Sequence, residues 1–163
     1  MKTLLLIRHA KSSWNDIGLS DFERPLNERG KHDAPLMAKK VKSKKIDIDA
    51  FVSSPAKRAK KTAEFFMDEF DAKEKKLTLI PSLYEASVEK YYDAIENLKD
   101  KDDTVALFAH NPGITDFINS LDCTPVYDMP TCAVYAIQIK TKNWKKFRKA
   151  KKEFLFFEYP KNI

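Results

Sequence analysis

The chain has 163 residues, of which 43% are hydrophobic, and its formal net charge is +6 at pH 7. This length lies within the usual size of one domain, so we expect a single domain over residues 1–163. The hydrophobic fraction is large enough for a core and excludes a disordered chain. Only three glycines are present, no two of them close in sequence, which excludes a glycine-rich phosphate loop and a dinucleotide fingerprint.

Continuous apolar runs and helically spaced apolar residues alternate along the chain. In chain order they predict a strand over 3–7, a loop over 11–25, a helix over 27–44, a strand over 48–53, a helix from 54, a strand over 77–80, a helix from 87, a strand over 104–109, a helix over 114–121, and strands over 133–139 and 153–159. Asn27 is the predicted N-cap of the first helix, and Ser54-Pro55 the predicted start of the second.

This alternation of strands and helices is typical of the α/β class. We therefore predict a three-layer αβα sandwich whose central sheet is mostly parallel and covered on both faces. In such a sheet, ligands bind beyond the carboxyl ends of the strands. Candidate functional residues are therefore expected where strands end.

The net positive charge of the chain comes from its last 24 residues. Residues 140–163 carry eight lysines and Arg148 against two glutamates, so the rest of the chain is nearly neutral. Basic and aromatic residues are mixed in this segment, which is a pattern of nucleic-acid-binding surfaces. The same pattern also fits a solvated surface whose lysine stems cover apolar atoms, or a surface that attracts a phosphorylated protein.

The cysteines and the lengths of the apolar runs predict the cellular compartment of the protein. Cys123 and Cys132 are the only cysteines, and we expect two free thiols in a reducing compartment, with a disulfide as the alternative. The first apolar run stops at Arg8 and is too short for a secretion signal. No apolar stretch is long enough to span a membrane, so we expect a soluble cytoplasmic protein without a membrane partner.

Arginine and histidine side chains follow three of the predicted strands. Arg8 and His9 come directly after the first strand. Arg58 lies just after the second, and His110 follows the fourth. Because the carboxyl ends of parallel strands meet at one edge of a sheet, we expect these four side chains to converge.

The residue types in this set favour phosphate chemistry. Arginine matches phosphate oxygens with two parallel hydrogen bonds. A neutral histidine can attack phosphorus, while a second histidine donates to the phosphate oxygens. Few carboxylates lie in the set, so we expect no metal and no cofactor. The set therefore predicts phosphoryl transfer through a phosphohistidine, aided by charge stabilisation.

Three segments carry a family resemblance. Leu4-Leu5-Leu6-Ile7-Arg8-His9 and the following residues to Asn15 resemble the opening motif of the histidine phosphatase superfamily, which includes the phosphoglycerate mutases. Ser53 to Ala59 with Thr62-Ala63 is similar to its second motif, and Ala109 to Gly113 to its third. The short length, the segment 24–30 and His110-Asn111-Pro112-Gly113 most resemble the SixA type of phosphohistidine phosphatase.

The resemblance implies a fold like that of phosphoglycerate mutase and a role for each matching residue. His9 would be the phosphorylated nucleophile. The phosphate pocket would be completed by Arg8, Arg58 and His110, with Asn15, Ser12 and Asn111 as further phosphate contacts. One departure is Ala10, which stands where the family has glycine after the nucleophile. We expect that this position does not need a positive φ here.

Glu85 is the candidate general acid, since many members of the family use a carboxylic acid in this region to protonate the leaving group. A general acid needs a raised pKa, and therefore burial beside the phosphate. The alternative is a loop glutamate paired with a lysine. A phosphohistidine substrate would need the acid less, because its leaving group is a ring nitrogen.

These observations predict a metal-independent phosphatase that acts through a phosphorylated His9. The first expected substrate is phosphohistidine in a protein. One alternative is a phosphatase of small phosphomonoesters with Glu85 as its acid. Another is a non-catalytic module that binds a phosphoprotein or RNA through residues 140–163, although we do not expect a nucleic-acid partner.

Overall fold

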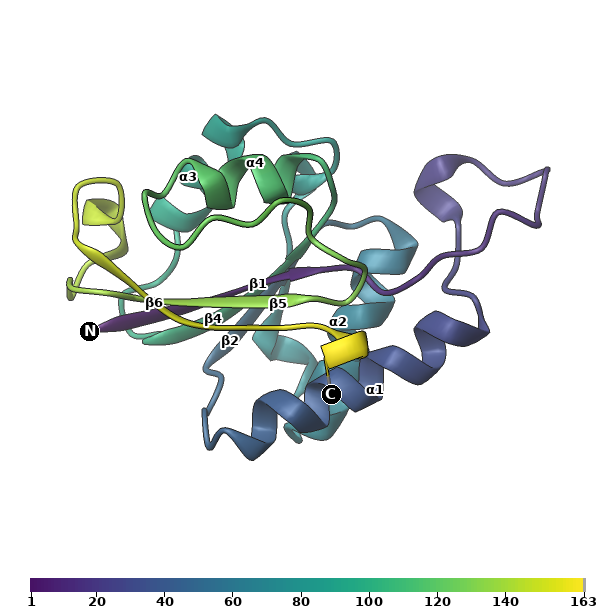
Figure 1. Ribbon diagram of the computed structural model, residues 1–163, viewed down its shortest axis with the longest axis horizontal. Helices are drawn as coiled ribbons and strands as arrows, with labels where there is room; N and C mark the ends of the chain where they lie inside the picture. Colours follow the sequence, from purple (N-terminus) through teal and green to yellow (C-terminus); the bar gives the residue numbers. More distant parts are fainter. Residues whose placement is uncertain (163) are drawn as a thin grey trace.

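Six strands form one sheet in the order β3-β2-β4-β1-β5-β6 in a computed structural model, which describes residues 1–162 (Figure 1). The strands are β1 Lys2–Arg8, β2 Ala50–Ser53, β3 Leu77–Leu79, β4 Thr104–Ala109, β5 Val134–Ile139 and β6 Lys152–Glu158. The helices are α1 Glu28–Ser43, α2 Lys57–Glu69, α3 Val88–Glu96 and α4 Gly113–Asn119.

The sheet is parallel on one side of β1 and antiparallel on the other. β1 runs parallel to β4, and β2 runs parallel to both β4 and β3. β5 is antiparallel to β1 and to β6. The prediction of an α/β domain with a mostly parallel sheet is confirmed, and the carboxyl ends of β1, β2 and β4 meet at one edge.

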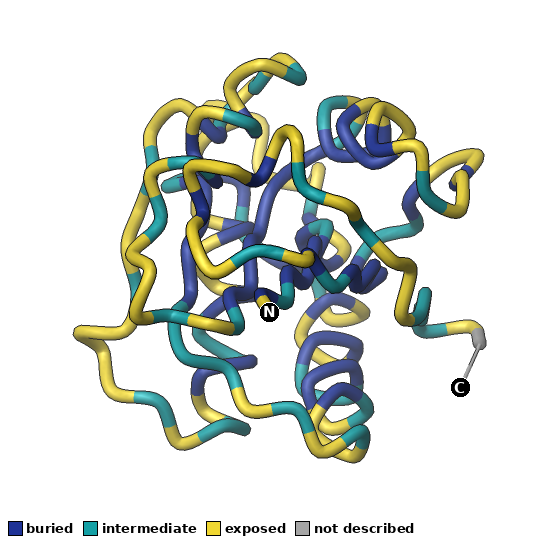
Figure 2. Tube along the Cα trace, turned by 90° about the vertical axis from the view of Figure 1, so that its left-hand side faces the viewer, coloured by how far each residue is buried: buried dark blue, intermediate teal, exposed yellow. Residues whose placement is uncertain are grey.

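The sheet separates two apolar clusters, and helices cover both faces. Along β1, Leu4 and Leu6 point into the cluster that α3 and α4 cover, whereas Leu5 and Ile7 point into the cluster that α1 and α2 cover. This alternation follows from the period of two in a strand. Figure 1 shows the two helix pairs on opposite sides of the sheet, and Figure 2 shows buried residues concentrated inside the trace.

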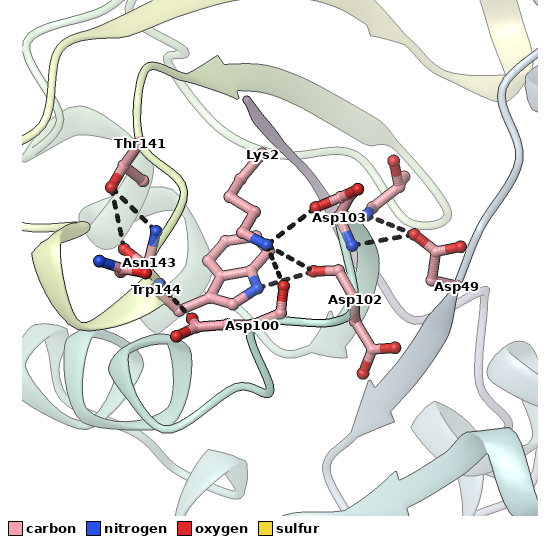
Figure 3. A network of polar contacts seen from close by, with 9 residues as sticks. Lys2, Asp49, Asp100, Asp102, Asp103, Thr141, Asn143 and Trp144 are labelled. Carbon is pink, nitrogen blue, oxygen red and sulfur yellow. Dashed lines mark hydrogen bonds and ion pairs between the residues drawn. The ribbon is translucent and has the colours of Figure 1, made fainter.

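The start of β1 is fixed by a network around Lys2, whose side chain is almost wholly buried (Figure 3). Its Nζ donates to Oδ1 of Asp103 at 2.9 Å and to the backbone oxygen of Asp100. Trp144 donates its backbone N–H to Oδ1 of Asp100 and its ring N–H to the oxygen of Asp102, both at 2.8 Å. Because a buried ammonium needs such partners, the network ties β1 to the segments before β4 and after β5.

The two predicted helix starts have different outcomes. The N-cap at Asn27 is confirmed, since its Oδ1 accepts from the N–H of Gly30 at 2.9 Å. The predicted start at Ser54-Pro55 is wrong, because α2 begins at Lys57 with Ala56 as its N-cap. The hydroxyl of Ser54 instead accepts from the N–H of Ala56 at 3.2 Å, closing a turn between β2 and α2.

The thiols of Cys123 and Cys132 are both free, as predicted. Within residues 1–162, no helix has the length and apolar character needed to cross a membrane.

Parts of the basic segment 140–163 are paired with carboxylates. Arg148 donates to both carboxylate oxygens of Glu89, at 3.0 and 2.9 Å, and Lys140 pairs with Glu153 at 3.0 Å. The segment includes β6, so some of its residues form an edge of the sheet. Ile163 lies outside the described residues.

Candidate active site

His9 lies immediately after β1, and its ring is held in one orientation. Its Nδ1 lies 2.7 Å from the backbone oxygen of Ala10, which can only accept a hydrogen bond. In the neutral ring, Nδ1 therefore carries the proton and Nε2 keeps its lone pair. Only 6% of the residue is exposed. The ring is thus a buried acceptor whose free nitrogen faces Arg58.

Ala10 follows His9 in a backbone conformation that alanine adopts without strain. It is absent from the described residues with positive φ, which agrees with the expectation from the sequence. Its N–H donates to Oγ1 of Thr62 at 3.0 Å, and that hydroxyl donates to the backbone oxygen of Arg58 at 2.8 Å. Thr62 therefore couples the position of His9 to α2.

Arg58 lies in the first turn of α2 and is 6% exposed. Its Nε is 3.4 Å from Nε2 of His9. Its Nη1 donates to the backbone oxygen of Asp21 at 2.6 Å, and its Nη2 donates to Oδ2 of the same residue at 3.0 Å. The guanidinium of Arg58 therefore faces Nε2 of His9 and, with its other two nitrogens, binds Asp21.

His110 follows β4 and lies beside His9, with 5.1 Å between the ring centroids. Its Nε2 is 2.8 Å from the hydroxyl of Ser54, whereas its Nδ1 is buried without a partner in the described part of the chain. Ser54 lies in the turn between β2 and α2. Its hydroxyl is therefore placed at the end of β2, where it orients His110.

Both histidines favour the neutral form. Burial is the main cause that lowers the pKa of His9 to about 3, and the nearby His110, Arg58 and Arg8 act in the same direction. Burial also lowers the pKa of His110 to about 4, with Arg58 as the next cause. At pH 7 both rings are therefore uncharged, and Nε2 of His9 keeps its lone pair.

Arg8 and Asn111 both bind the segment before β5. Arg8 donates from Nη1 to the backbone oxygen of Met129 at 2.7 Å. Asn111 donates from Nδ2 to the same oxygen at 3.1 Å and to Oδ1 of Asp128 at 2.6 Å. The amide of Asn111, which we predicted as a phosphate contact, is therefore already engaged in holding this segment beside Arg8.

Ser12 and Asn15 lie at different places on the loop after β1. Ser12 is buried, and its hydroxyl accepts from Nη2 of Arg24 at 2.5 Å. Asn15 is exposed, and its backbone N–H donates to the hydroxyl of Ser13 at 3.1 Å. The structure brings Ser12 close to an arginine of the site and leaves Asn15 outside the cavity described next.

A cavity of about 450 Å³ opens beside these side chains. It is lined by Asp21, Arg58, Tyr84, Glu85, Ala86, His110, Asn111, Pro112, Gly113 and Asp116. Glu85 therefore reaches the cavity, in a backbone conformation with φ of 54°. Its side chain is exposed, however, so the burial expected of a general acid is not found.

Asp21 and Tyr84 line the cavity and Arg24 lies beside Asp21, although the sequence alone assigned no role to any of the three. Tyr84 donates its hydroxyl to Oδ2 of Asp21 at 2.6 Å, and its ring lies 5.6 Å from that of His110. This hydrogen bond raises the pKa of Tyr84 to about 12, and it is the main cause that lowers the pKa of Asp21. Arg24 does begin the segment 24–30 that resembles the SixA type, and this resemblance could have directed attention to it.

Four buried side-chain nitrogens have no hydrogen-bond partner within residues 1–162. They are Nε of Arg8, Nε and Nη1 of Arg24, and Nδ1 of His110. Three are donors of guanidinium groups, all four lie in one region of the molecule, and buried polar groups are normally paired. Within residues 1–162, no group of three or more His, Cys, Asp or Glu side chains is arranged so that it could hold a metal ion. The chemistry of this donor set suits an anion.

Known proteins are similar to this chain in sequence and in fold. The sequence profile of the histidine phosphatase superfamily (branch 1) matches residues 4–116. An uncharacterized chloroplastic protein of Arabidopsis thaliana is 28% identical over 151 residues, which are 88% of this chain and 69% of that protein. A 2,3-bisphosphoglycerate-dependent phosphoglycerate mutase of Bartonella henselae is 34% identical over 86 residues, 52% of this chain but only 42% of the mutase.

Among solved structures, the protein histidine phosphatase SixA complexed with tungstate has a TM-score of 0.81, with 98% of each chain covered and 23% identity. This likeness concerns the fold. The matched residues 4–116 contain Arg8, His9, Arg58 and His110. The chain therefore belongs to branch 1 of the histidine phosphatase superfamily and has the fold of its SixA-type members.

Proposed function

We propose that the protein is a phosphatase that needs no metal and forms a phosphohistidine intermediate on His9. The observation that carries this proposal is the presence of unpartnered buried donors near a neutral histidine whose Nε2 keeps a lone pair directed toward Arg58. A dianionic phosphoryl group would supply acceptors for those donors. Arginine charges in a buried site stabilise the equatorial oxygens of such a group most strongly in the transition state.

The reaction has two in-line displacements. In the first, Nε2 of His9 forms a bond to phosphorus while the bond from phosphorus to the leaving group breaks, and the leaving group takes that electron pair and a proton from solvent, while Nδ1 of His9 keeps its own proton. In the second, water attacks phosphorus, the P–N bond breaks, and its electron pair returns to His9. Arg8, Arg58 and His110 hold the phosphoryl oxygens in both steps.

Phosphohistidine in a protein is the proposed substrate. An imidazole leaving group accepts a proton easily, so its departure does not need a buried carboxylic acid, and Glu85 is exposed. Similarity of fold to the protein histidine phosphatase SixA supports the same choice. Small phosphomonoesters are the second candidate, favoured by the position of Glu85 at the cavity.

Trapping of the phosphoenzyme tests this function. The protein is mixed with an activated aryl phosphate in EDTA and quenched within milliseconds. We expect acid-labile, base-stable phosphate on His9. In His9→Ala, both this phosphate and the turnover should disappear. Turnover that survives this substitution would contradict the mechanism, and turnover that requires a divalent ion would contradict metal independence.

The alternative of a non-catalytic binding module is tested with RNA. Salt-dependent RNA binding without hydrolysis of the aryl phosphate would favour such a module.

Glu85→Gln separates the two candidate substrates. If the carboxyl protonates alkoxide leaving groups, kcat for alkyl phosphates should fall about 10²-fold or more, while kcat for a phosphohistidine protein should change little. Both are measured on the same variant, with Glu89→Gln as a control because Glu89 pairs with Arg148 instead. Equal losses on both substrates would refute the proposed distinction.

A further inference from the structure

Arg24 is a buried cation whose hydrogen-bonding capacity is mostly unused. It follows the short turn Asp21–Glu23 and is 8% exposed. Its Nη2 donates to Ser12, but within residues 1–162 its Nε and Nη1 have no hydrogen-bond partner. Leaving a guanidinium buried and under-partnered costs free energy. Such an arrangement is expected where a ligand supplies the missing acceptors.

The guanidinium of Arg24 is fixed in orientation by its neighbours. Trp14 stacks on it, with 3.3 Å between the guanidinium carbon and the ring centroid. Ser12, which accepts from Nη2, is itself buried and is bridged to Leu26 by backbone pairing. The side chain is therefore positioned before any ligand binds, which lowers the entropic cost of binding.

One carboxylate spans the two arginines of this region. Oδ2 of Asp21 lies 3.0 Å from Nη2 of Arg58, and Oδ1 of the same carboxylate lies 3.7 Å from Nε of Arg24. The nitrogen of Arg24 that faces this carboxylate is one of its unpartnered donors, because 3.7 Å is too long for a hydrogen bond. A phosphoryl group carries more acceptor oxygens than a carboxylate, so it can supply acceptors that Asp21 does not give to Arg24.

We propose that Arg24 is a third arginine of the phosphate site and donates to a phosphoryl oxygen of the substrate. This inference rests on the proposed function and deepens it. Arg58 connects Arg24 to His9. Its Nε faces the proposed nucleophilic nitrogen of His9, and its Nη2 donates to the carboxylate of Asp21, which also lies beside Arg24. The carboxylate of Asp21 occupies the anion position in the free protein, and the phosphoryl group takes its place on Arg24 and Arg58.

Tungstate binding tests this role without requiring turnover. The wild type, Arg24→Ala, Arg24→Lys and the control Arg29→Ala are titrated with sodium tungstate by calorimetry, and the tungstate-induced shift in Tm is recorded. Arg29 is a suitable control because it is exposed and pairs with Asp33. We expect Kd to rise about tenfold or more in Arg24→Ala, less in Arg24→Lys, and not at all in Arg29→Ala.

A purely structural role for Arg24 predicts different results. In that case the Tm without ligand would fall, while the tungstate Kd and the tungstate-induced shift would match those of the wild type, and the inference would be overturned. If Arg24→Ala does not fold, Arg24→Lys decides alone, since an unchanged Kd there overturns the need for a guanidinium donor. A wild type that binds no tungstate would defeat the proposed phosphate site as a whole, whereas tight binding by both wild type and Arg24→Ala would defeat only the role of Arg24.

Discussion

Arg58→Ala is expected to lower kcat/KM for an activated aryl phosphate by about 10²–10³-fold, the effect of removing a main donor to developing negative charge. Arg58 faces Nε2 of His9, the nitrogen proposed as nucleophile, and also donates to the carboxylate of Asp21. Its loss removes a positive charge from a buried site, where charge is poorly screened. The measurement is steady-state kinetics with the variant folded, as judged by circular dichroism.

Lys57→Ala provides the matched control for this substitution. Lys57 precedes Arg58 in the same helical turn and carries the same charge, but it is exposed. A general effect of net charge on substrate attraction would lower kcat/KM similarly in both variants. A loss confined to Arg58→Ala would locate the effect in the site, and equal modest losses would contradict the role proposed for Arg58.

Lowering the pH from about 6.5 to 4 is expected to destabilise the fold. The folded protein holds His9 and His110 neutral, with pKa values of about 3 and about 4, whereas the unfolded chain protonates both near 6.5. In this window the unfolded state therefore binds more protons, so the free energy of unfolding falls as the pH falls. A tenfold difference in proton affinity between the two states corresponds to about 1.4 kcal/mol, so the two groups together contribute on the order of several kcal/mol.

Urea unfolding between pH 7 and 4 measures this slope. The double variant His9→Gln, His110→Gln is expected to flatten it, whereas His32→Gln, which changes a histidine with a 74% exposed side chain, should leave it intact. Asp21, whose pKa is lowered mainly by the hydrogen bond from Tyr84, adds to this slope only at the acid end of the window, where the unfolded chain begins to bind a proton on it. An unchanged slope in the double variant would show that other groups control the acid sensitivity.

The sequence could predict the centre of the site because strand ends are readable from apolar patterns. Arg8, His9 and His110 directly follow buried runs, and the parallel order of β1 and β4 brings those runs together. The layered fold could be predicted from the same apolar patterns. The antiparallel direction of β5 could not be predicted, because an apolar run carries no information about the direction of pairing.

The outer part of the site could not be predicted, because its residues lie on loops without periodicity. Asp21 and Arg24 occupy the long connection between β1 and α1, where nothing in the sequence shows which side chain is buried. Conversely, Asn15 and Asn111 match family motifs, but one is exposed and the other is bonded to Asp128 and Met129. Side-chain direction in loops is decided by tertiary contacts, which a local pattern does not encode.

The central place of β1 has a consequence for the order of events during biosynthesis. Among the six strands, β1 leaves the ribosome first, yet it pairs with β4 and β5, whose residues begin at positions 104 and 134. Such long-range pairing carries a large entropic cost of loop closure and slows folding. His9 therefore cannot be bonded to Ala109 and Cys132, as it is in the folded protein, until those distant residues have been synthesised, so the candidate site forms late.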